Sequence, residues 1–145
     1  MEPIRELAFD RTHRDHKLMI DFAERIKAAC TQRSTVDDCH QCCPDLRHIC
    51  RSAVENLIKA FVEATLKHDV IEALLMKGNV PPAHRLAHMQ SHIAIAEQLK
   101  SIRVVLSEDG NCVLAVDGID GVLSLLLAHY EEYDQPLENY LLGPI

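Results

Sequence analysis

The sequence predicts an all-α protein that folds as an up-down-up-down antiparallel four-helix bundle. Apolar residues recur at helical spacing in four stretches, and proline and glycine are almost confined to the gaps between them. The alternation in CVLAVDG (112–118) could pass for a strand, but a lone strand has nothing to pair with. A chain of 145 residues can bury a core of its own, so we expect a single domain over 1–145.

The first two helices follow from apolar stripes before and after a cysteine-rich segment. The first is expected from about Arg11 to Cys30, and the second from about Ile49 to Met76. Gly78 suits a helix C-cap, and the prolines that follow it cannot continue the helix. The connection between the two helices, at about 30–50, is longer than a bundle loop requires.

The other two helices lie on either side of a polar break. The third is expected to start near Pro82 and to end before SEDGNC (107–112). The fourth is expected from about Asp117 or Ile119 to Leu142. Four such helices with modest connections make an up-down-up-down bundle.

Charge and composition exclude two classes of partner. The formal net charge is −7, from 15 basic and 22 acidic residues, and no basic cluster could follow a phosphate backbone. We therefore expect no nucleic acid partner. No apolar run approaches the roughly 20 residues that span a bilayer, and the N-terminus carries no export signal. The sequence thus predicts a cytoplasmic protein without a membrane partner.

Polar residues on the apolar stripes are the most informative feature of the sequence. A single histidine on such a stripe is usually hydrogen-bonded within the core. Burial of many polar groups is costly unless each finds a partner, and one shared metal centre would satisfy all of them. The residues in phase with the apolar stripes are His16, His68, Glu72, His88, His92 and His129.

Helix geometry limits which histidines can share an ion. His84, His88 and His92 follow one another at intervals of four in AHRLAHMQSH (83–92). Positions eight apart lie about 12 Å apart along the helix axis, so one ion cannot bind both His84 and His92. Asp134 follows His129 by five residues, so on a regular helix its side chain would point about 140° away from that of His129. This direction suits a carboxylate that reaches a second metal.

The ligand count then favours a pair of irons with one vacant coordination position. Five imidazoles and two carboxylates are available. If both carboxylates bridge two irons that also share an oxo or hydroxo group, the iron with three histidines has six ligands and the iron with two has five. The remaining coordination position would suit a small gas.

These residues resemble the hemerythrin family, specifically its bacterial single-domain members. The resemblance covers most of the chain. It is carried by HKLMIDF (16–22), HDVIEALLM (68–76), PPAHRLAHMQSH (81–92) and LLLAHYEEYDQPLENYL (125–141), which match all seven ligand positions at the family's spacing. It implies a four-helix di-iron protein that binds dioxygen for carriage, storage or sensing.

The resemblance also implies a role for each ligand. His88, His92 and His129 would hold the saturated iron, His16 and His68 would hold the open one, and Glu72 and Asp134 would bridge them. His88 and His92 are then the pair on the third helix. His84 is expected to be a surface residue or to lie behind the ligands.

Two residues depart from the family pattern near the gas pocket. Asp69 stands where the family usually has phenylalanine, and Tyr130 stands where it usually has isoleucine. An apolar pocket protects bound oxygen from protonation, so these residues would make plain oxygen carriage less natural than chemistry on peroxide or nitric oxide. Met19 and Leu126, each one helical turn from a ligand, remain suitable apolar walls.

The cysteine-rich connection allows three interpretations. Cys39, Cys42, Cys43 and Cys50 have spacing that could hold zinc or form a redox-sensitive disulfide. The second cysteine pair is poorly formed for a zinc site, so an ordinary reduced loop is the third interpretation. Either of the first two would make the protein a sensor rather than a carrier.

Three functions therefore remain open from the sequence. The first is a non-haem di-iron protein that binds dioxygen or another small gas without catalysis. The second is a di-iron enzyme or redox sensor acting on peroxide or nitric oxide, although ferritin-like oxidases use a ligand set richer in carboxylates. The third is a metal-sensing or thiol-sensing module. The sequence does not identify a protein partner.

Overall fold

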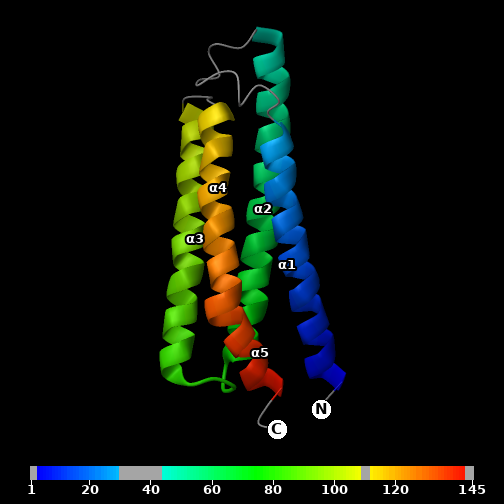
Figure 1. Cartoon of the computed structure of the whole chain (residues 1–145), viewed down its shortest axis with the longest axis vertical. Helices are drawn as coiled ribbons and strands as arrows, with labels where there is room; N and C mark the ends of the chain where they lie inside the picture. The colour runs from blue at the N-terminus through cyan, green and yellow to red at the C-terminus, as the bar shows by residue number, and fades with distance from the viewer. Residues whose placement is uncertain (1–2, 30–43, 109–111, 143–145) are drawn as a thin grey trace.

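The computed structural model describes residues 3–29, 44–108 and 112–142, and this part of the chain contains helices and no strand. The all-α prediction is therefore confirmed. The elements are α1 (Pro3–Ala29), α2 (Pro44–Met76), α3 (Pro82–Glu108), α4 (Cys112–His129), the π-helical turn η2 (Tyr130–Asp134) and α5 (Gln135–Leu142). The long helices α1 to α4 lie side by side, with the start of α1 and the short helix α5 at the same end of the bundle (Figure 1).

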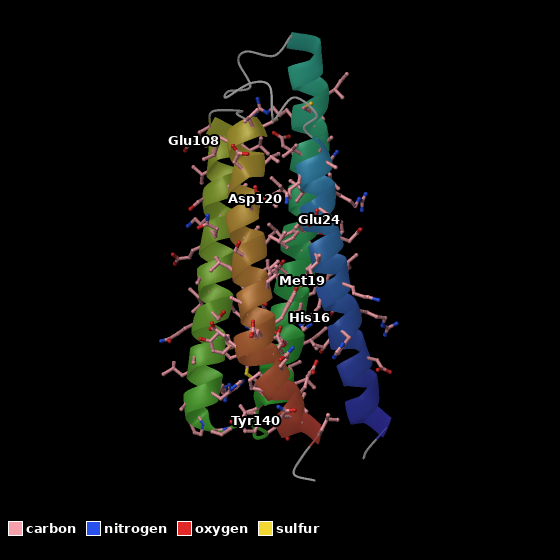
Figure 2. All side chains as sticks on the ribbon, viewed as in Figure 1. His16, Met19, Glu24, Glu108, Asp120 and Tyr140 are labelled. Carbon is pink, nitrogen blue, oxygen red and sulfur yellow. The ribbon has the colours of Figure 1, made fainter. Side chains whose placement is uncertain are left out.

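The four long helices enclose a common interior. Helix α1 contacts α2 and α4, and helix α3 contacts the same two neighbours. Each helix can therefore turn one stripe toward the other three. Side chains project into the space between the helices along much of the bundle (Figure 2).

Three helices are longer than the sequence suggested. Helix α1 begins at Pro3 rather than near Arg11, and α2 begins at Pro44 rather than near Ile49, so the end of the cysteine-rich connection is helical. Helix α4 begins at Cys112, which makes CVLAVDG part of a helix. Its strand-like alternation is overridden because Cys112 and its neighbour Val113 are both buried in the bundle.

The connection between α2 and α3 has the predicted turn chemistry. Gly78 has a φ of 76°, the left-handed conformation that glycine adopts without strain. Asn79 donates its backbone N–H to Met76 O at 3.1 Å and its side-chain amide to Leu75 O at 2.7 Å, which satisfies the end of α2. Helix α3 starts at Pro82, where the missing N–H has no cost.

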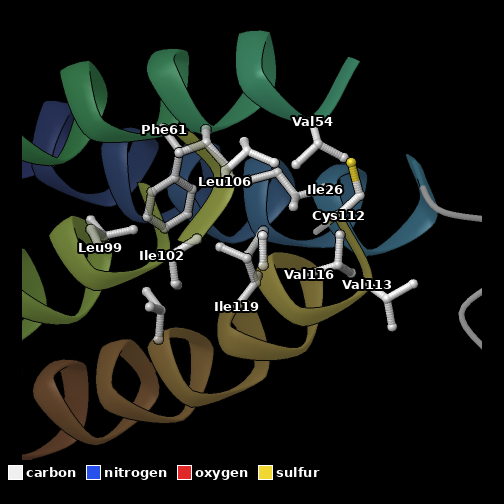
Figure 3. Packing of buried hydrophobic residues seen from close by; sticks show 14 of the residues in the cluster. Ile26, Val54, Phe61, Leu99, Ile102, Leu106, Cys112, Val113, Val116 and Ile119 are labelled. Atoms are coloured by element: carbon white, nitrogen blue, oxygen red, sulfur yellow. The ribbon is translucent and has the colours of Figure 1, made fainter. Parts of the chain in front are cut away.

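Apolar side chains fill the bundle on both sides of a polar level. Figure 3 shows the larger cluster, in which Phe61 and Ile119 are fully buried. Helices α3 and α4 approach closely there, because a Cβ at Gly118 would lie 2.8 Å from Ile102 Cγ1. A smaller cluster, Met76, Leu137 and Leu141, closes the other end. Along α2, and from α4 to α5, the predicted ligands lie between these clusters.

Among the residues that the structure describes, one helical segment is long and apolar enough to cross a membrane by length and composition. It runs from Cys112 to Leu142, and 44% of its most apolar window is buried in the bundle. Polar residues interrupt its apolar runs, so we did not expect this segment from the sequence. A core helix of a soluble protein passes the same test, and this segment contacts α1, α2 and α3. The finding is weak evidence for a membrane span.

Candidate metal centre

The structure brings all seven predicted ligands to one level of the bundle. Six of them are buried, and the His16 side chain is 12% exposed. Figure 2 shows His16 on the lower half of α1, just below Met19. The residues come from every long helix and from η2, and they are His16, His68, Glu72, His88, His92, His129 and Asp134.

These side chains form two groups that could each hold one ion. We call Glu72, His88, His92 and His129 the three-histidine position, and His16, His68, Glu72 and Asp134 the two-histidine position. Within each group, one ligand atom per residue lies within 4.8 Å of every other. Glu72 belongs to both groups, so the two positions adjoin at its carboxylate.

The two carboxylates lie among the histidine nitrogens. Glu72 Oε1 is 2.8 Å from His68 Nε2 and 3.0 Å from His92 Nε2, which belong to different positions. Asp134 also reaches both sides. Its Oδ2 is 2.9 Å from His16 Nε2, and its Oδ1 is 3.0 Å from His129 Nε2. Each carboxylate therefore lies where it could bridge two ions.

Several of these buried atoms have no hydrogen-bond partner. They include Glu72 Oε2, both oxygens of Asp134, and Nε2 of His88 and His129. His88 Nε2 lies 3.1 Å from Asp134 Oδ1, yet the pair does not have hydrogen-bond geometry. Buried polar atoms are rarely left unsatisfied, and lone pairs that converge without bonding one another are what ligands of a shared ion present. The residues therefore fit a metal pair.

A π-helical turn places Asp134 at the site. In a regular helix His129 and Asp134, five residues apart, would point in different directions. Residues 130–134 instead form a single π turn, whose bonds join residues five apart, and this brings Asp134 Oδ1 within 3.0 Å of His129 Nε2. The five-residue spacing was expected to suit a carboxylate reaching a second metal, and Asp134 Oδ2 does lie 2.9 Å from His16 Nε2 of the other position. Its carboxylate lies beside both positions.

The carboxylates and histidines shift one another's pKa. Burial alone would raise the pKa of Glu72, but the surrounding imidazoles of His129, His68, His88 and His92 hold it well below its usual value. Burial alone would lower the pKa of His129, but the neighbouring carboxylates of Asp134 and Glu72 outweigh burial and raise it to about 9. The metal-free site therefore holds protons that compete with metal ions.

The stability of the metal-free protein is expected to fall between pH 6.5 and pH 9. The folded pKa of His129 is raised from 6.5 to about 9, so its contribution is complete below 6.5 and is lost as the pH rises through 9. This shift corresponds to a contribution on the order of 3 kcal/mol.

Thermal melts of metal-free and metal-loaded protein check this expectation. Glu72 and Asp134 have lowered pKa values, so they stay ionised and contribute a constant amount over this range. The metal-loaded protein should show the opposite trend, because deprotonated histidine binds metal better. A metal-free melting temperature that rises from pH 6.5 to pH 9 would contradict the arrangement.

Ser91 supports the predicted ligand His129, a contact that the sequence did not predict. Its Oγ lies 2.6 Å from His129 Nδ1, so a hydrogen bond fixes the ring with Nε2 toward the centre. Replacing Ser91 by alanine should lower metal affinity about 10-fold to 100-fold and leave the fold intact. Competition with a chelator measures this change, and Ser101→Ala on the exposed face of α3 is the matched control. Unchanged affinity would show that the bond has no role in ligation.

The predicted pocket residues lie on different sides of the centre. Met19 and Leu126 are both 1% exposed and belong to the apolar core. The Tyr130 ring lies 4.1 Å from the His16 ring, and its hydroxyl donates to His16 O at 3.4 Å. Asp69 is half-buried, and its Oδ1 lies 3.5 Å from His92 Nε2. Burial raises the pKa of Asp69 to about 6, against the lowering effect of His92.

Most of the cysteine-rich connection is outside the described residues. Cys39, Cys42 and Cys43 fall in that part, so zinc, a disulfide and a reduced loop all stay predictions. Cys50 lies on α2, is buried, and has its Sγ 3.8 Å from Ala29 O.

A scan against protein-family models finds no match, and searches of curated proteins and of solved structures find none either. Fold and site together define a helical bundle whose buried histidines and carboxylates could bind metal. The choice of metal and of ligand depends on the chemistry of those side chains.

Proposed function

We propose that this chain is a hemerythrin-like, non-haem di-iron protein that binds dioxygen reversibly, and that its helices follow the up-down-up-down order. The observation that carries the proposal is the pair of adjoining four-residue groups that share Glu72. Five imidazoles with two carboxylates suit iron, because thiolates, which favour zinc and copper(I), are absent from these groups.

The two positions differ in a way that favours a vacancy. The three-histidine position has three nitrogen donors and the two-histidine position has two, while the carboxylates reach both. Bound by these residues, a reduced iron pair would supply the electrons for reversible dioxygen binding. The vacancy would lie at the two-histidine position, beside His16 and His68, one helical turn from buried Met19.

The surroundings of His16 limit what could protonate a bound gas. The hydroxyl of Tyr130 is directed to the backbone of His16, so the ring rather than the hydroxyl lies against the histidine. Burial raises the pKa of Tyr130 well above its usual value, which keeps the phenol neutral. Tyr130 therefore acts as a largely apolar wall, and this supports carriage, storage or sensing.

Asp69 supports the second candidate, a di-iron enzyme or redox sensor acting on peroxide or nitric oxide. Its carboxylate lies 3.5 Å from His92 Nε2, within the polar level, at a place where the resemblance implies phenylalanine. A polar side chain so close to the ligands makes the centre less apolar than an oxygen carrier requires. Its 3.5 Å contact is with His92 of the three-histidine position, and so gas binding remains the first proposal.

Addition of dioxygen to the anaerobically reduced, iron-loaded protein separates the candidates. The proposed function predicts a visible absorption band that appears with oxygen and disappears on its removal, over repeated cycles. Irreversible bleaching with consumption of peroxide or nitric oxide would favour the enzyme instead. A protein purified with zinc and no iron would favour the sensing module, whose cysteines lie mostly outside the described residues.

We also propose a cytoplasmic location. The apolar segment Cys112–Leu142 turns its buried face to the bundle, and that face carries His129 and Asp134. A segment that contributes two ligands to an interior site is better explained as a core helix than as a membrane span.

A further inference from the structure

The histidines of the two positions differ in what lies behind their rings. In the three-histidine position, His88 Nδ1 lies 3.1 Å from His84 Nε2, and His129 Nδ1 lies 2.6 Å from Ser91 Oγ. In the two-histidine position, His68 Nδ1 is buried without a hydrogen-bond partner, and its nearest carboxylate oxygen, on Asp15, is 3.6 Å away. At the three-histidine position, the rings of His88 and His129 are each held by a hydrogen bond at Nδ1. At the two-histidine position, the ring of His68 has no such hydrogen bond.

His84 is itself held in place. It lies in the first turn of α3, half-buried, with its ring edge-on to Tyr140 at 5.3 Å and to Tyr133 at 6.4 Å between ring centroids. When His88 binds an ion through Nε2, its proton must be on Nδ1, so this nitrogen donates to His84 Nε2. His84 must then carry its own proton on Nδ1.

The carboxylates do not favour the three-histidine position. Glu72 belongs to both groups, and Asp134 belongs to the two-histidine group although it also contacts His129. What favours the three-histidine position is the number of its histidines and the support behind them. A ligand that is already oriented loses less rotational freedom on binding, and outer hydrogen bonds of this kind change metal affinity about 10-fold to 100-fold.

We propose that His84 is a positioning residue for His88, and that its support makes metal loading ordered, with the first ion entering the three-histidine position and the second the two-histidine position. This inference rests on the metal site of the proposed function but not on the gas that the site binds. It concerns affinity and order of filling, which can be measured with a redox-inactive ion.

Titration of the metal-free full-length protein with zinc(II), followed by nuclear magnetic resonance of the histidine ring nitrogens, tests the order. The first equivalent should shift the signals of His88, His92 and His129, and the second should shift those of His16 and His68. The Nδ1–H proton of His88 should exchange slowly with water, because it is held by His84.

Substitution of His84 then tests the cause. His84→Ala should weaken the first step about 10-fold to 100-fold, leave the second step unchanged, and speed exchange of the His88 proton. His84→Gln, whose amide oxygen can accept the same hydrogen bond, should restore the order. Arg85→Ala, an exposed position in the same turn, should behave as the wild type. Circular dichroism establishes that each variant is folded.

Three results would overturn the inference. Simultaneous filling of both positions by the wild type would contradict the order. Equal weakening of both steps in His84→Ala would show a general effect on the scaffold, and no change would show that His84 does not position His88. A protein that binds no zinc and no iron at this level would contradict the proposed function itself, whereas two ions bound without order would contradict only this inference.

Discussion

Replacement of Glu72 by glutamine is expected to remove both metal ions from the protein. Glu72 is the residue common to the two groups, it is fully buried, and its Oε1 lies within 3.0 Å of a histidine from each position. Glutamine keeps the shape of the side chain but not its charge, so the positive charge of the two ions is no longer compensated. Metal content should fall from about two ions per chain to near zero.

Elemental analysis of the purified variant measures this loss, and Glu63→Gln is the matched control. Glu63 lies on the same helix with its side chain exposed, so that variant should keep both ions. Circular dichroism of Glu72→Gln should show a folded helical protein, because the apolar clusters above and below the centre are unchanged. If Glu72→Gln retained two ions, a shared bridging carboxylate would be excluded.

Replacement of His129 by alanine is expected to remove one ion and leave the other. His129 belongs to the three-histidine position, and its Nε2 lies 3.0 Å from Asp134 Oδ1. The two-histidine position keeps all four of its residues. The loss of a buried side chain should cost roughly 1–3 kcal/mol of folding free energy, which leaves a folded bundle.

Metal analysis with circular dichroism checks the His129 variant. The visible absorption band expected of the iron pair should disappear, while the helical signal remains. Leu127→Ala, at an exposed position on the same helix, should keep both ions and the band. Retention of both ions by His129→Ala would show that His129 is a structural residue rather than a ligand.

Helical periodicity was sufficient to predict the inward stripes and the residues on them. His68 and Glu72 lie in phase with Phe61, and His88 and His92 lie in phase with Leu99, because burial of an apolar stripe fixes how each helix is turned. The start of α4 was not predictable in this way. Its first residues include buried side chains on several sides, and their alternation resembles that of a strand.

The π turn appears in the sequence as one extra residue in the spacing of the inward-facing positions. From Val116 to Leu141, buried residues follow one another at intervals of three or four, except between His129 and Asp134, where the interval is five. A single π turn absorbs the extra residue and lets Leu137 and Leu141 continue the inward stripe. Local preferences do not distinguish this turn from a regular helix, so only the spacing of the ligands reveals it.

The residues behind the ligands were the least predictable part of the site. Ser91 precedes His92 but bonds His129 on another helix, which follows from the packing of α3 against α4. Its place in the sequence carries no signal of that contact. His84 was expected to be a surface residue or to lie behind the ligands, and the structure shows it half-buried beside His88.

Anomalous X-ray diffraction at the iron edge, on crystals of the protein as purified, tests the central claim most directly. The proposed centre predicts two iron peaks that adjoin at the Glu72 carboxylate, one among His88, His92 and His129 and the other beside His16, His68 and Asp134. A single peak, no peak, or Glu72 and Asp134 turned away from each other toward solvent would contradict it.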